Sequence, residues 1–130
     1  MHPEGDPEVT GLDVEGHSKN QDFLYGLDLL NHGYFWESHV WFEALWNKAG
    51  RKGERADFLK LLIKVGAYGV KCLVDQSNIA LVHLERAKEL IPQKEVCGFL
   101  PSELVHLLSL LEEGKLTKGQ LPVEFLPKNF

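Results

Sequence analysis

The apolar residues of this 130-residue chain recur at helical spacing in successive segments, and no segment of useful length alternates as a strand would. Glycine and proline residues separate the segments, as is typical of helices joined by short turns, which pack as antiparallel neighbours. The pattern predicts an all-α fold, a single-domain bundle of about five helices built from two consecutive helical hairpins and a short fifth helix. The first three expected helices are 18–32, 34–49 and 55–74. Asp75 or Ser77 would cap a fourth helix that ends at Ile91, and after a linker, residues 93–101, Ser102 would cap a fifth that runs through Leu111.

The two ends of the chain differ from this helical body in composition. Residues 1–17 are rich in proline, glycine and acidic residues, and we expect them to form a loose amino-terminal arm. The helical domain then covers residues 18–114. Residues 115–130 contain prolines and several apolar side chains, so we expect an extended tail that packs on the domain and hides those side chains from water.

Composition and charge restrict the cellular compartment and the kinds of binding partner that we expect for this protein. The formal net charge is -5, and the clearest basic cluster, residues 51–55, is interrupted by an acid, so no nucleic-acid partner is expected. The most apolar stretch, residues 58–74, contains three lysines, which argues against a membrane span. The first residues lack the features of a signal peptide, so we expect a cytoplasmic protein with Cys72 and Cys97 reduced.

The segment 33–46 holds all three tryptophans together with a histidine and two glutamates. In a helix, about 100° per residue places His39, Glu43 and Trp46 along one side, with Trp36 at the same flank. In one interpretation, Glu43 orients and charges His39 for proton transfer, or both residues hold a metal ion. In the other, they hydrogen-bond each other or a partner helix at the edge of an aromatic core. A metal site needs a third ligand, and the fold would have to bring His32, His83 or His106 to this pair, because none of them stands at a ligand spacing from it. We therefore assign no catalytic residue, metal ion or cofactor.

A stripe of lysines marks the third expected helix. Lys60, Lys64 and Lys71 lie within about 40° of one another around the helix axis. One interpretation is the solvated face of an amphipathic helix. In the other, Lys60 and Lys64 face the carboxylates of the preceding helix, Glu37 and Glu43, and form a small polar pocket for an anion or a polar metabolite.

Trp41 falls away from the apolar face of its helix and needs cover. The carboxy-terminal tail would supply that cover within one chain. A second copy of the chain would supply it across an interface, where tryptophan is over-represented among the residues that carry binding energy. We therefore expect a homodimer.

These residues resemble the signature of domain-of-unknown-function family 309, a family of short all-α proteins. Its first motif reads approximately Gly-x-Tyr/Phe-(Phe/Trp)-Glu-Ala-His-Glu-x-Trp/Leu-Glu-x-x-Trp. It is filled here by Gly33, Glu37, His39, Glu43 and Trp46. The apolar part of a second motif, Phe-Leu-Gln-Gly-Leu-Ile-Gln, is filled by Phe58, Leu59, Leu62 and Ile63. The resemblance covers about residues 23–90 and implies the fold and the location of a polar cluster, but no reaction.

The chain departs from the family pattern within that polar cluster. Val40 replaces a glutamate that usually follows the histidine, and Lys60 and Lys64 replace glutamines. Lys71 stands where the family often has a histidine. The cluster of this chain has therefore lost an acid and gained positive charge.

Two main functions are compatible with these patterns. The first is a non-catalytic helical module that binds a partner or a small polar or anionic ligand between the second and third helices. The expected binding residues are His39, Glu43, Trp36, Trp46, Glu37, Lys60 and Lys64. The alternative is a small hydrolase-like or metal-assisted enzyme with His39 as base or ligand and Glu43 as its partner. Nucleic-acid binding through the lysines is the weakest hypothesis.

Overall fold

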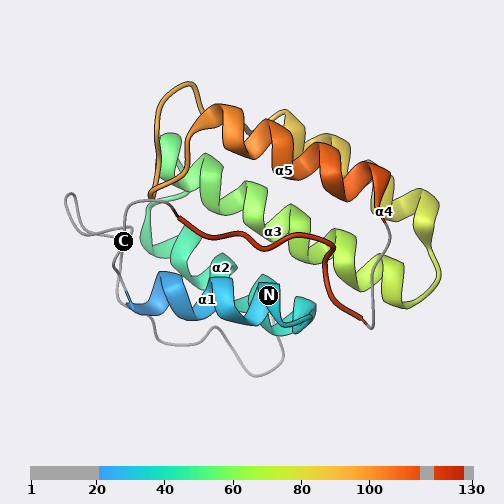
Figure 1. Cartoon of the computed structure of the whole chain (residues 1–130). Coiled ribbons are helices and arrows are strands. Elements are labelled where there is room, and N and C mark those ends of the chain that lie inside the picture. The colour runs from blue at the N-terminus through green and yellow to red at the C-terminus, as the bar shows by residue number, and fades with distance from the viewer. Residues whose placement is uncertain (1–20, 115–118, 128–130) are drawn as a thin grey trace.

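The computed structural model describes residues 21–114 and 119–127, and within them five helices pack as an all-α bundle (Figure 1). The predicted fold class is confirmed. The helices are α1 (Gln21–Asn31), α2 (Phe35–Lys48), α3 (Glu54–Leu73), α4 (Ser77–Lys88) and α5 (Pro101–Glu113). Each helix packs against the next one along the chain. The predicted arm at 1–17 lies outside the described residues. No helix in the described part of the chain has the length and apolar character needed to cross a membrane.

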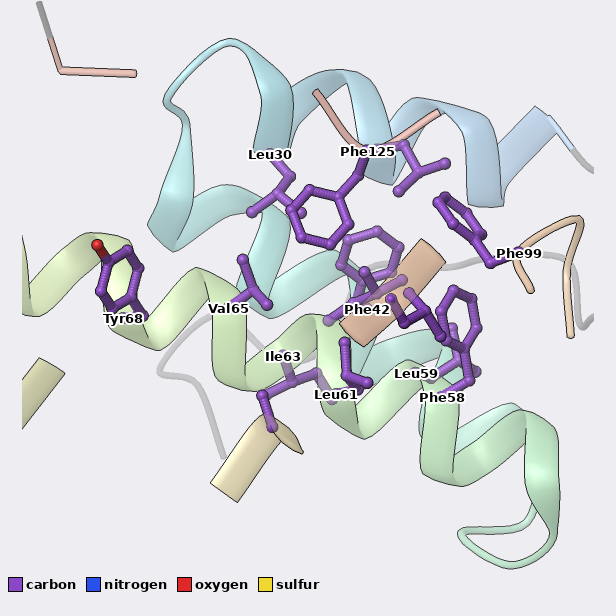
Figure 2. Close-up of a cluster of buried hydrophobic side chains, with 14 of the residues drawn as sticks. Leu30, Phe42, Phe58, Leu59, Leu61, Ile63, Val65, Tyr68, Phe99 and Phe125 are labelled. Carbon is purple, nitrogen blue, oxygen red and sulfur yellow. The ribbon is translucent and has the colours of Figure 1, made fainter. Parts of the chain in front are cut away.

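The 20-residue helix α3 lies at the centre of the bundle, between α2 and α4 (Figure 1). Figure 2 shows phenylalanines from separate segments gathered against it: Phe42 from α2, Phe99 from the loop before α5 and Phe125 from near the carboxyl end, beside Phe58 of α3 itself. The rings of Phe58 and Phe99 lie 5.3 Å apart, and those of Phe99 and Phe125 6.5 Å apart. Burial of these large apolar side chains provides the main hydrophobic stabilisation of the fold.

Small residues allow α2 and α3 to approach closely. Gly69 lies against the buried ring of Phe35, where a Cβ atom would overlap the ring. At Gly66, a Cβ atom would lie 3.2 Å from both the carbonyl oxygen of Phe35 and the hydroxyl of Ser38. That buried hydroxyl donates to the Phe35 carbonyl at 3.0 Å. These contacts hold α2 in one orientation on α3, which determines where the other sides of α2 face.

Part of the expected linker, residues 93–101, contributes to the core. Val96 and Phe99 pair as an antiparallel bridge, with N–H to carbonyl distances of 3.0 and 2.9 Å. The residues between them, Cys97 and Gly98, have φ angles of 53° and 84°, and positive φ at both central positions is the type I′ arrangement that suits a tight hairpin. Val96, Cys97 and Phe99 are all buried. Helical periodicity gives no sign of such a turn.

Two predicted helix starts are corrected by the structure. Neither Asp75 nor Ser77 caps α4; the cap residue is Gln76, and Asp75 has φ 60° in the turn after α3. Helix α5 begins at Pro101 rather than after a cap at Ser102. Proline suits the first helical position because its missing N–H would have no partner there.

One predicted helix end is also corrected, since α4 ends at Lys88 and not at Ile91. The N–H of Leu90 donates to the carbonyl of Ala87 at 3.0 Å, and the N–H of Ile91 donates to the carbonyl of Lys88 at 3.4 Å. These bonds span three residues instead of four, so the chain tightens and leaves the α-helix before Pro92.

Residues 119–127 run as an extended segment across α3 (Figure 1). Phe125 is fully buried, and its backbone is bound at both polar atoms by the side chain of Asn31 at the end of α1. The Asn31 amide donates to the Phe125 carbonyl at 3.0 Å, and its oxygen accepts from the Phe125 N–H at 2.7 Å. Both the burial of Phe125 and the side chain of Asn31 therefore hold this segment on the bundle.

Candidate functional site

His39 has a defined neighbour at each ring nitrogen. Its Nδ1 lies 3.4 Å from the carbonyl oxygen of Ile63 in α3, and because a carbonyl can only accept, Nδ1 is the donor. Its Nε2 lies 3.6 Å from Oε2 of Glu43, one turn along α2. The ring also stacks on Trp36, with centroids 5.5 Å apart and planes 8° apart. The structure thus brings together three of the residues that the sequence singled out.

The pair of His39 and Glu43 borders the solvent. Their side chains are 21% and 24% exposed, so water reaches both while most of each side chain is covered. Partial exposure strengthens electrostatic interactions relative to those of fully solvated groups, because less water screens them. A solute from outside the molecule can reach this pair.

Trp46 lies further along α2 and carries two cations. The guanidinium of Arg51 is 5.2 Å from the centroid of the Trp46 ring system, and Nζ of Lys60 is 5.8 Å from it. Both distances are within the range of a cation–π interaction. Lys60 is therefore directed at an aromatic ring of α2. Glu37, by contrast, is exposed, and no interaction joins it to the other described residues.

Lys64 lies one turn along α3 from Lys60 and is partly buried. Burial lowers the pKa of Lys64, and the positive charges of Lys60 and Arg86 lower that pKa further. Within residues 21–114 and 119–127, no hydrogen bond or ion pair engages its ammonium group. In the part of the chain that the structure describes, the interior side of the lysine stripe therefore carries a positive charge that no acid contacts.

Helix α4 adds two groups that sequence reasoning did not assign to the site, His83 and Arg86. Burial has the largest effect on His83 and lowers its pKa. The positive charges of Lys64, Lys71, His39 and Arg86 lower this pKa further. Charged groups of α2, α3 and α4 thus affect the imidazole of His83. The three helices, which pack side by side, therefore contribute side chains to the same surface of the protein. We call Lys60, Lys64, Lys71, His83 and Arg86 the basic face.

The sequence held only a partial signal for the α4 residues. His83 and Arg86 are three positions apart, which places them on the same side of α4, away from the core positions Ala80 and Ala87. That spacing identifies a polar side of α4. It does not indicate that this side borders the lysines of α3, which depends on how the helices pack.

Trp41 is covered by α1. Its Nε1 donates to the carbonyl oxygen of Asp22 at 2.7 Å, and its ring meets Tyr25 edge to face with centroids 4.8 Å apart. Among the described residues, α1 therefore supplies cover for Trp41, a source that the sequence did not suggest.

The described side chains do not include a group of three or more histidine, cysteine, aspartate or glutamate residues arranged to hold a metal ion. The arrangement beside His39 offers instead one carboxylate, an aromatic surface and several cations. Such a set suits recognition of a polar or anionic group by charge and hydrogen bonding.

Comparison with known proteins gives one family. Residues 23–80 match the model of the family described as Domain of unknown function (DUF309), which confirms the resemblance seen in the sequence. The match includes α2 and α3 with His39, Glu43, Lys60 and Lys64. Neither the search of curated proteins nor that of solved structures gives a match.

Proposed function

We propose that this chain, whose residues 23–80 belong to the DUF309 family, is a non-catalytic helical module that binds a small polar or anionic ligand beside His39. The observation that supports this most is the local charge. Cations of α3 and α4 gather beside the His39 and Glu43 pair in a protein whose net charge is -5. Like charges held close together repel one another, and a bound anion would relieve that repulsion.

The contacts that both ring nitrogens of His39 make within the protein favour a binding role for this residue over a catalytic one. Its Nδ1 donates to the main chain of α3, and its other nitrogen faces Glu43. The neighbouring hydroxyl, Ser38, is buried and donates to the Phe35 carbonyl, so it is not placed to act as a nucleophile. A rigid imidazole stacked on an indole is well suited to orient a ligand.

The alternative function is a hydrolase-like enzyme with His39 as base and Glu43 as its partner. The partial exposure of the pair favours it, since a substrate could reach the exposed part of the imidazole. A Glu43→Gln variant would separate the two functions. It would greatly reduce any ester or amide hydrolysis, whereas binding of a ligand through the cations would persist.

The binding proposal predicts that a ligand stabilises the protein by mass action. The probes are a panel of simple carboxylates, inorganic phosphate, phosphate esters and neutral sugars, measured by thermal unfolding and tryptophan fluorescence. We expect at least one probe to raise Tm, and we expect His39→Ala and Trp36→Ala to weaken its binding roughly tenfold or more. Val105→Ala, which truncates an exposed apolar residue of α5, is the control and should leave binding unchanged. A panel without any effect at millimolar concentration would refute the proposal.

We further propose that the module acts as a homodimer, through a surface other than the one around Trp41. Leu73 and Val74 at the end of α3, with Ile79 and Val82 on one side of α4, are between 44% and 57% exposed. Clusters of exposed apolar side chains are uncommon on monomers and often mark an interface. This surface borders the basic face at His83.

A further inference from the structure

His83 and Arg86 extend the proposed binding site from α2 and α3 onto α4. We infer that the ligand carries a phosphate group and that Lys64, His83 and Arg86 hold this phosphate. The inference rests on the proposed binding function and adds the chemical class of the ligand and the residues that recognise it.

The placement of these groups follows from helix geometry. Lys60, Lys64 and Lys71 form one stripe along α3, and Ala67 lies on the same stripe between the last two with only a methyl side chain. On one side of the stripe, α2 contributes His39, which contacts α3 at Ile63. On the other side, α4 packs against α3 through its buried residues Ala80, Leu84 and Ala87. The partly buried His83 lies next to this buried row on the helix surface, and Arg86 lies one step further out on the same side. Lys64, His83 and Arg86 are close enough for their charges to affect one another.

These basic groups have no acidic partner among the residues that the structure describes. Within the described ranges, Lys64, His83 and Arg86 make no hydrogen bond or ion pair, and the carboxylate of Glu43 already faces His39. Cations kept together without counter-charges are unfavourable unless an external group compensates them. Binding of an anion would therefore relieve the repulsion among these groups.

The number and type of donors favour phosphate over carboxylate. A phosphate group carries about 1.5 to 2 negative charges near neutral pH, against one for a carboxylate, and so compensates more than one cation. The planar fork of Arg86 can bind two phosphate oxygens, while Lys64 supplies a point charge. The adjacent stack of Trp36 and His39 then offers a surface to the remainder of an esterified ligand.

The inference includes a pH dependence centred on His83. The charged groups that act on it are Lys64 and Lys71 from α3, His39 from α2 and Arg86 from α4 itself, and together with burial they lower its pKa. A bound dianion opposes this effect and raises the pKa of His83. Binding is therefore accompanied by proton uptake and becomes tighter as the pH falls through the range between the two values. Sulfate, which remains a dianion throughout this range, separates the protonation of His83 from that of phosphate.

The test follows the His83 ring signals by NMR in the full-length protein during titration with inorganic phosphate, a sugar phosphate monoester, sulfate and acetate. We expect both phosphate compounds and sulfate to shift these signals, and acetate to bind at least tenfold more weakly. Arg86→Ala and Lys64→Met should each weaken phosphate binding roughly tenfold or more. Lys94→Ala removes an exposed cation from the loop before α5 and serves as the matched control. Circular dichroism verifies that each variant is folded.

Each outcome has a defined meaning. Tighter binding of the monoester than of inorganic phosphate would identify an esterified ligand, and equal binding would identify the free anion. The inference is overturned if phosphate leaves the His83 signals unchanged at millimolar concentration, or if Lys94→Ala weakens binding as much as Arg86→Ala does. It is also overturned if a short single-stranded oligonucleotide binds while the small phosphates do not. Carboxylate binding that requires Trp36 and His39, without phosphate binding, would refute the inference and leave the proposed function intact.

Discussion

At the scale of single residues, Gly69 sets the distance between α2 and α3. Its missing side chain leaves room for the ring of Phe35, and a Cβ atom would overlap that ring. We predict that Gly69→Ala lowers the free energy of unfolding by about 1–3 kcal/mol, because overpacking outweighs the gain of up to about 1 kcal/mol in helix propensity. Chemical denaturation would measure this change.

Gly66→Ala is the matched comparison for that prediction, since it makes the same exchange one turn earlier in α3. Its Cβ atom would approach the Phe35 carbonyl and Ser38 hydroxyl to 3.2 Å, which requires a shift of only a few tenths of an ångström. The gain in helix propensity offsets much of this smaller strain. We expect the Gly66 variant to be the more stable of the two. The reverse order would show that Gly69 does not determine the helix spacing.

At the scale of elements, α1 holds the carboxy-terminal segment through one side chain. Asn31 donates to and accepts from the backbone of Phe125, so its loss leaves two partly buried backbone groups without these bonds. We predict that Asn31→Ala destabilises the protein by about 1–3 kcal/mol in urea denaturation. Asn47→Ala, which removes an acceptor of an exposed bond from Arg51, should change stability by less than about 0.5 kcal/mol. Equal effects of the two variants would contradict the proposed attachment.

At the scale of the whole molecule, the proposed homodimer is tested by light scattering after size-exclusion chromatography. We expect twice the mass of one chain for the natural sequence and a monomer for Val82→Glu, because transfer of a carboxylate from water into an apolar interface is unfavourable. Leu81→Glu is the matched control: Leu81 is 45% exposed and Val82 is 54% exposed, but Leu81 lies about 100° away around α4. A natural protein that is monomeric at every concentration would exclude the dimer.

Much of the architecture was accessible to sequence reasoning. The helices were predicted close to their observed ends, because apolar periodicity and glycine or proline stops are properties of short segments. The turn at Cys97 and Gly98 was not predicted, because its features are not properties of a short segment alone. Its positive φ angles and the burial of Val96 and Phe99 depend on contacts with distant parts of the chain.

The sequence by itself determined which residues form helices, which side of each helix is apolar, and that Trp36, His39, Glu43 and Trp46 share one side of α2. These properties follow from residue spacing along one segment. Only the tertiary structure decided that α1 covers Trp41 and that α4 lies along the lysine stripe of α3, with His83 and Arg86 beside Lys64. The lateral position of a helix depends on how side chains and glycines of two helices fit together, and periodicity within either helix does not encode that fit.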